Sequence, residues 1–178
     1  MNPPTTPALG RQFRRIVTQS DHLIAILDGA GPAIDARQQR VSAWNVAQHL
    51  EHLGITGSLT LDTIDSLLGG NGHPQGSPST MGRLVLLSGR IPRGRGKARP
   101  EWFPGDGGRE AARQRLEAYR LRLPALEADL PRIADSRQAS RHAVLGYFNA
   151  RQWLRFLAIH QQHHLRIIAD IGSAVARS

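Results

Sequence analysis

Hydrophobic residues recur three and four positions apart over long stretches of the chain, which predicts amphipathic helices. A first helix is predicted over about residues 10–28, where the apolar stripe ends at a pair of glycines before Pro32. A second begins at Asn45, a good N-cap with Gln48 three residues later, and stops at Gly69. This Asn–Gln pair has the arrangement of a capping box, which marks a helix start.

The second half of the chain predicts two further helices. A third starts near Asp106, and Pro124 should kink or split it because proline removes a backbone donor. A fourth is capped by Asn149, again with a glutamine three residues later at Gln152, and runs to about Val175. The pattern therefore predicts an all-α four-helix bundle.

The segments between these helices complete the predicted organisation. Residues 1–9 are a Pro/Thr-rich arm without periodicity, which we expect to be flexible, and residues 10–178 form one bundle domain. Residues 69–107 are rich in Gly, Pro, Ser and Arg and form a long crossover between the second and third helices. An apolar stretch at 84–87 predicts a short helix inside this crossover. No set of strands is predicted.

Composition excludes several classes of protein. The 178 residues include no cysteine, so disulfides, thiolate ligands and a cysteine nucleophile are excluded. The longest aliphatic run, residues 84–87, is far too short to cross a bilayer. The first residues show no apolar core behind a basic start, as a signal peptide would. We expect a cytoplasmic protein that does not enter a membrane.

The net charge of +9 comes almost entirely from arginine, because Lys97 is the only lysine. Its densest part is a cluster at Arg90, Arg93, Arg95, Lys97 and Arg99 in the crossover. The simplest interpretation is a solvated basic loop. Binding of nucleic acid or another anion is the alternative, although stacking aromatic residues are not interleaved with these arginines.

Two histidines interrupt the apolar stripe of the last helix. His160 and His164 are four residues apart, so both rings lie on the face that also carries Leu157. A divalent metal ion bound to both would satisfy these polar rings. No glutamate follows the first histidine, so this is not the HExxH motif of zinc proteases. A third ligand could come from His49 or His52 in the second helix, and their spacing does not choose between them.

Three segments resemble the DinB-like superfamily. Residues 44–53, Trp-Asn-Val-Ala-Gln-His-Leu-Glu-His-Leu, are similar to the opening of its second helix. Residues 150–164, which end in His-Gln-Gln-His-His, look like its closing helix. His142-Ala-Val-Leu-Gly146 is similar to the "H-P-x-x-G" loop ahead of that helix, with Ala143 in place of proline. The resemblance extends in order and spacing from about residue 10 to 173.

The resemblance implies a bundle of up-down-down-up topology, commonly a homodimer, with three histidine ligands at one end of a cavity. The matching positions here are His52, His160 and His164, which leaves His49 and His163 as extra histidines. Zn²⁺ or Ni²⁺ is expected, because imidazole suits both and cysteine is absent. Known members imply a metal-dependent thiol S-transferase or hydrolase that acts on a small electrophilic molecule, with a low-molecular-weight thiol as a further candidate cofactor.

Other roles stay open at this stage. Glu51 and His163 neighbour ligands in sequence but project about 100° away from them, so neither is expected in the site. His142 is a candidate for substrate contact or a simple loop hydrogen bond. The arginine-rich crossover could bind the carboxylates of a thiol cofactor. The alternative function is a non-enzymatic protein that binds nucleic acid or an anionic ligand through this crossover, with a vestigial or structural metal site.

Overall fold

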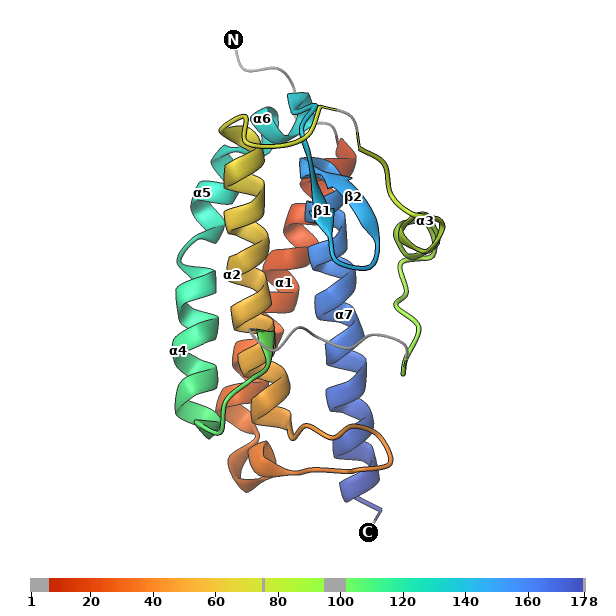
Figure 1. Ribbon diagram of the computed structural model, residues 1–178. Helices are drawn as coiled ribbons and strands as arrows, with labels where there is room; N and C mark the ends of the chain where they lie inside the picture. Colours follow the sequence, from red (N-terminus) through yellow and green to blue (C-terminus); the bar gives the residue numbers. More distant parts are fainter. Residues whose placement is uncertain (1–6, 75, 95–101, 178) are drawn as a thin grey trace.

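A computed structural model describes residues 7–74, 76–94 and 102–177. Within them, four long helices pack side by side: α1 (Pro7–Gly29), α2 (Val46–Leu68), α4 (Gly108–Arg120) and α7 (Ala150–Val175). In Figure 1, α1 and α7 run from the end near the N-terminus toward the opposite end, whereas α2 and α4 run the other way. The predicted all-α bundle is confirmed. None of the described helices combines the length and apolar character that crossing a membrane requires.

Both predicted capping boxes are present and fix the starts of the two helices that carry the candidate ligands. The Asn45 side chain accepts from the backbone N–H of Gln48 at 2.8 Å, and the Gln48 side chain accepts from the Asn45 N–H at 3.1 Å. Asn149 and Gln152 repeat this exchange at the start of α7, with both distances 3.0 Å. Each box satisfies backbone donors that would otherwise lack partners.

One helix begins earlier than predicted, and the third predicted helix is divided at Pro124 as expected, with a second break that was not predicted. Helix α1 begins at Pro7, inside the predicted arm of residues 1–9, while residues 1–6 lie outside the described part of the chain. The third predicted helix is three helices: α4, α5 (Leu123–Ala128) and α6 (Leu130–Asp135). Pro124 lies in the first turn of α5, and Pro131 lies in the first turn of α6. Proline is tolerated there because the first-turn N–H groups have no helical partner.

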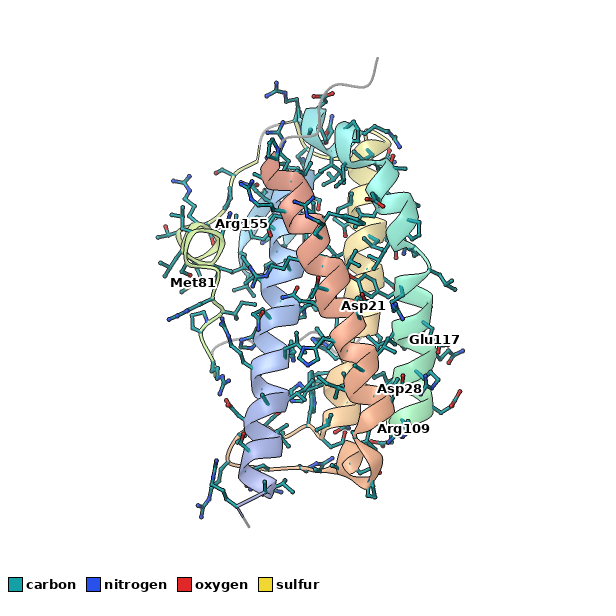
Figure 2. The ribbon with its side chains drawn as sticks, turned by 180° about the vertical axis from the view of Figure 1, so that it is seen from behind. Asp21, Asp28, Met81, Arg109, Glu117 and Arg155 are labelled. Carbon is teal, nitrogen blue, oxygen red and sulfur yellow. The ribbon has the colours of Figure 1, made fainter. Side chains whose placement is uncertain are left out.

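The crossover contains the short helix that the apolar stretch predicted, α3 (Thr80–Ser88). Ser79 caps its start, and Gly89 ends it in the left-handed conformation with φ 65°. The Arg155 side chain of α7 donates to the Leu86 carbonyl at 2.6 Å and so ties α3 to the bundle (Figure 2). Residues 95–101, with three of the five cluster cations, lie outside the described residues.

A β-hairpin precedes α7, which corrects the prediction that the chain contains no strands. Strand β1 (Ala139–His142) pairs antiparallel with β2 (Gly146–Asn149). Each strand has four residues, too few for an alternating pattern to be recognised. Gly146 has a φ of 84°, and a Cβ there would collide with the backbone of Ser79. The glycine thereby allows the hairpin to pack against the crossover, whose Pro78 forms a β-bridge with Gly146.

The core extends along the bundle as two clusters of buried apolar side chains. Ile16, Ile64 and Leu154 belong to one, and Leu27 and Leu50 to the other. Helices α2 and α4 approach closely at Gly57, where a Cβ would lie 2.8 Å from the Tyr119 ring. Salt bridges join α4 to α1 on the opposite face, including Arg120–Asp21 and Arg113–Asp28, both at 2.6 Å; Figure 2 labels the two aspartates.

Candidate metal centre

The predicted ligand residues come together between α2 and α7. His52 lies on α2, and His160 and His164 lie one turn apart on α7. One ring nitrogen from each of the three lies within 4.8 Å of the other two. The two capping boxes fix the first residues of α2 and α7. They thereby help to determine that the face of α2 with His52 meets the face of α7 with His160 and His164.

The His52 ring is oriented by a carbonyl from the far end of the crossover. Its Nδ1 lies 2.7 Å from the carbonyl oxygen of Trp102. A carbonyl can only accept, so the hydrogen is on Nδ1 and the Nε2 lone pair is left for an ion. A carbonyl partner of this kind is common behind metal-binding histidines.

His164 is held by a second histidine, His49, which the family resemblance left outside the ligand set. The Nδ1 atoms of His49 and His164 lie 2.9 Å apart, and His49 Nε2 lies 3.0 Å from the Ser42 hydroxyl. The backbone N–H of Trp44 also donates to this hydroxyl, at 3.1 Å. The His164–His49–Ser42 chain therefore leads away from the candidate centre into the loop before α2. In the sequence, the one sign that His49 lies close to the site was its spacing of three residues from His52.

The third ring is held by packing. The His160 ring stacks on Phe156 with a centroid separation of 5.7 Å and meets the His52 ring edge-on at 5.3 Å. No hydrogen-bond partner for His160 occurs among residues 7–74, 76–94 and 102–177. Its orientation thus depends on the aromatic surface of α7 and on the neighbouring imidazole.

Burial keeps the three rings neutral. It lowers the pKa of His160 and His164 well below the ordinary value of 6.5, and the neighbouring histidines lower both further. Burial also lowers the pKa of His52, which the Trp102 carbonyl partly offsets. A neutral imidazole has a lone pair ready for a cation, so protons compete little with a metal near neutral pH.

The donor set fits a divalent metal ion. Nitrogen atoms bound tetrahedrally at about 2.1 Å from one ion are about 3.4 Å apart. The three ring nitrogens lie within 4.8 Å of one another, so small side-chain rotations that move the nitrogens by about 1 Å would bring them to that spacing. Three neutral nitrogen ligands leave coordination positions open, as in catalytic zinc sites rather than closed structural ones.

A large cavity opens directly beside the three histidines. Its volume is about 1160 Å³, and His52, His160 and His164 form part of its wall. The other walls come from α2, α3, the hairpin, α7 and the segments around Trp44 and Phe103. The open side of the candidate centre therefore faces a space large enough for a small-molecule substrate.

Of the other residues considered from the sequence, His163 and His142 line this cavity, whereas Glu51 is buried outside its wall. His163 lies outside the three-histidine cluster, although it contributes to the cavity wall and its ring centroid is 5.2 Å from that of His164. Glu51 is buried but is not part of the cavity wall. His142 Nδ1 accepts from the backbone N–H groups of Val144 and Leu145, both at 3.2 Å, which is the predicted loop hydrogen bond. Its ring also lies in the cavity wall.

Four long helices with a buried three-histidine cluster between the second and the last define a helical bundle protein with a candidate metal centre. The sequence model of the DinB superfamily matches residues 15–168. The chain therefore belongs to the DinB superfamily, as its three motifs indicated. Neither a curated protein nor a solved structure matches it.

Proposed function

We propose that this protein is a metal-dependent enzyme, a thiol S-transferase or a hydrolase, whose ion is held by His52, His160 and His164. The observation that carries the proposal is the position of three neutral imidazoles on the wall of a large cavity. A structural metal site would be enclosed by its ligands, whereas this cluster is open on the side where a substrate would lie.

Zn²⁺ or Ni²⁺ suits this donor set, because imidazole binds both and the chain has no thiolate. Such an ion, when bound, makes a water molecule or a thiol nucleophilic near neutral pH. The absence of cysteine means that any thiol must arrive as a second substrate, such as a low-molecular-weight thiol. The protein then contributes orientation, through the Trp102 carbonyl and His49, and an aromatic wall that excludes bulk water.

Non-enzymatic binding of nucleic acid through the arginine-rich crossover is the competing proposal. Arg93 already pairs with Asp170 at 2.7 Å, which reduces what it offers to a phosphate. Salt dependence separates the two proposals. Binding through six or more phosphates should weaken by about a thousandfold or more between 50 and 200 mM salt.

The decisive test is turnover by untagged, metal-loaded protein. A neutral electrophile would be offered with bacillithiol, mycothiol or glutathione, and an activated ester would be offered with water alone. Activity should disappear with a chelator, return with added ion and be absent in His160→Ala. His22→Gln, which changes an exposed histidine outside the cavity wall, is the matched control and should retain activity. Absence of turnover in all arms, together with salt-sensitive binding of DNA or RNA, would overturn the proposal.

We also propose that the protein is a homodimer, as the family resemblance implies. Support comes from the exposure of Leu84 and Leu87 on the outer side of α3, at 55% and 80%. Light scattering at micromolar concentration should give twice the chain mass of 19.5 kDa. A mass near that of a single chain would contradict this proposal and leave the enzymatic one untouched.

A further inference from the structure

The wall of the cavity beside the three histidines is strongly aromatic. All three tryptophans of the chain, Trp44, Trp102 and Trp153, line it together with Phe103 and Phe156. From this lining we propose that the cavity binds an uncharged substrate with a bulky aromatic body and places its reactive group at the histidine cluster. The placement of the reactive group rests on the proposed function, whereas the choice of ligand rests on the cavity alone.

The aromatic surface is continuous with the candidate centre. The Trp44 ring lies 4.9 Å from the His52 ring and 5.8 Å from the Phe103 ring, measured between centroids. On the other side, the Phe156 ring stacks on His160 at 5.7 Å and lies 6.0 Å from Trp153. A flat aromatic ligand that reached the histidines would have ring faces and edges of both groups available for contact.

Charge in the cavity wall disfavours an ionic ligand. Among the described lining residues there is no aspartate or glutamate, and Arg93 is the only arginine or lysine. The Arg93 guanidinium is paired with Asp170, and both side chains are about half exposed, at 49% and 50%. In the metal-free protein, a charged ligand that moved into the aromatic part would lose its hydration without gaining an oppositely charged partner among the described lining residues there.

Several donors along the wall are already engaged by the protein itself. The hydroxyls of Thr56 and Thr60 donate to carbonyls one turn earlier in α2, at 2.8 and 2.7 Å. The indole N–H of Trp153 donates to the Ser140 hydroxyl at 3.0 Å. The α2 wall therefore presents threonine methyl groups and acceptor oxygens, and these favour an apolar ligand over one rich in acceptor groups.

Apolar side chains continue to the mouth of the cavity. Leu59, Phe103 and Val144 all line it, yet 39%, 48% and 63% of their surfaces are exposed. Large apolar residues are costly to leave in water, and an apolar molecule in the cavity would cover part of this exposed surface. The volume of about 1160 Å³ exceeds that of most sites for one drug-sized ligand, so a fused-ring substrate would leave room for a thiol.

The test uses unreactive neutral probes and metal-free protein, so that binding does not depend on the ion. 2-Naphthalenemethanol, benzyl alcohol and 2-naphthoate would be titrated by calorimetry. The second ring should make the naphthyl alcohol bind about tenfold more tightly than benzyl alcohol, because it buries more apolar surface. Naphthoate, which has the same rings with one charge, should bind at least tenfold more weakly than the naphthyl alcohol. Equal or tighter binding of naphthoate would overturn the proposal.

A pair of variants locates the probe. Leu59→Glu places a charge at the partly exposed cavity wall and should weaken binding of 2-naphthalenemethanol at least tenfold. Leu121→Glu makes the same change at the end of α4, where the side chain is 82% exposed and does not line the cavity, and should leave binding unchanged. Circular dichroism would verify that both variants fold, and Met81→Gln, also in the wall, would replace Leu59→Glu if it did not. Equal binding by a folded wall variant and wild type would overturn the proposal.

The same experiments separate this inference from the proposed function. If the naphthyl alcohol binds in the cavity but the metal-loaded protein turns over no substrate, the enzymatic proposal fails and the ligand class stands. If turnover occurs but only with charged substrates, the function stands and the ligand class is overturned.

Discussion

The Nδ1 atoms of His49 and His164 lie 2.9 Å apart, although 115 positions separate the two residues in the chain. Burial lowers the pKa of both rings, so each is neutral near pH 7 and only one can carry the hydrogen between them. With the hydrogen on His164, His49 accepts it and its own Nε2–H donates to the Ser42 hydroxyl. This arrangement leaves His164 Nε2 free for an ion, whereas the opposite tautomer would block it.

Loss of His49 should therefore weaken metal binding even though His49 is not a ligand. We expect His49→Phe, which keeps the ring volume without an acceptor, to lower metal affinity about tenfold to a hundredfold. His49→Asn places an amide oxygen near the position of Nδ1 and should recover most of the affinity. Competition titrations with a chromogenic chelator would measure both. Equal losses in the two variants would show that His49 only fills space.

Direct removal of a ligand should have a larger effect than removal of its hydrogen-bond partner. We expect protein purified without an affinity tag to contain one divalent ion per chain, Zn²⁺ or Ni²⁺, by elemental analysis. His52→Ala, His160→Ala and His164→Ala should each be isolated with little metal, because two imidazoles bind it too weakly to survive purification.

The matched control for the ligand variants is His163→Gln, whose ring lies beside His164 but outside the cluster. It should keep its metal. The ligand assignment would be wrong if the alanine variants kept theirs, or if the His163 variant lost as much as they did.

The sequence predicted those features that depend on neighbours along the chain. Asn45 and Asn149 cap their helices through partners three residues away, so both helix starts were predicted correctly. His160 and His164 share a helix face for the same local reason. Assigning His52 required the resemblance to the DinB family, because His49 lies on the same side of α2.

Features built from distant segments were not predicted. The carbonyl of Trp102 reaches His52 from 50 positions away, and the His49–His164 contact joins different helices. Neither leaves a periodic signal in the sequence. The hairpin was missed because its strands have four residues each and its pairing with the crossover is long-range. The cavity likewise depends on how the crossover folds back over α2 and α7.

The buried histidines should make the metal-free protein sensitive to acid. Burial, followed by the influence of His52 and His163, lowers the pKa of His49 from 6.5 to about 3. The unfolded chain therefore binds more protons than the folded protein below pH 6.5. Above pH 6.5 the His49 ring is neutral in both states, so the free energy of unfolding keeps its full value. As the pH falls from 6.5 toward about 3, protons bind the unfolded chain preferentially and the free energy of unfolding decreases.

Each such histidine should lower the free energy of unfolding by up to about 1.4 kcal/mol per pH unit within that window. Urea denaturation of metal-free protein between pH 7.5 and 4.5 would measure the slope. His49→Phe should give a shallower dependence, and the exposed His22→Gln should follow the wild type. A wild-type stability that is constant down to pH 4.5 would contradict the neutral, buried state of these rings.

The last prediction concerns a polar pair in the centre of the bundle, one residue along α7 from His160. The side-chain N–H of Gln161 donates to the Tyr119 hydroxyl at 3.0 Å, and both side chains are fully buried. Gln161 Oε1 has no partner within the described part of the chain. Removing the hydroxyl leaves the Gln161 amide without its acceptor, so we expect Tyr119→Phe to cost about 1–3 kcal/mol.

Gln161→Met removes the other partner and should cost a similar amount, whereas the double variant leaves neither group unpaired. Its loss should therefore be smaller than the sum of the single losses, by about 1 kcal/mol or more. Urea denaturation of the four proteins completes the cycle at one pH. Strictly additive losses would show that the two groups do not stabilise one another, and that this contact does not help to hold α7 against α4 beneath the candidate centre.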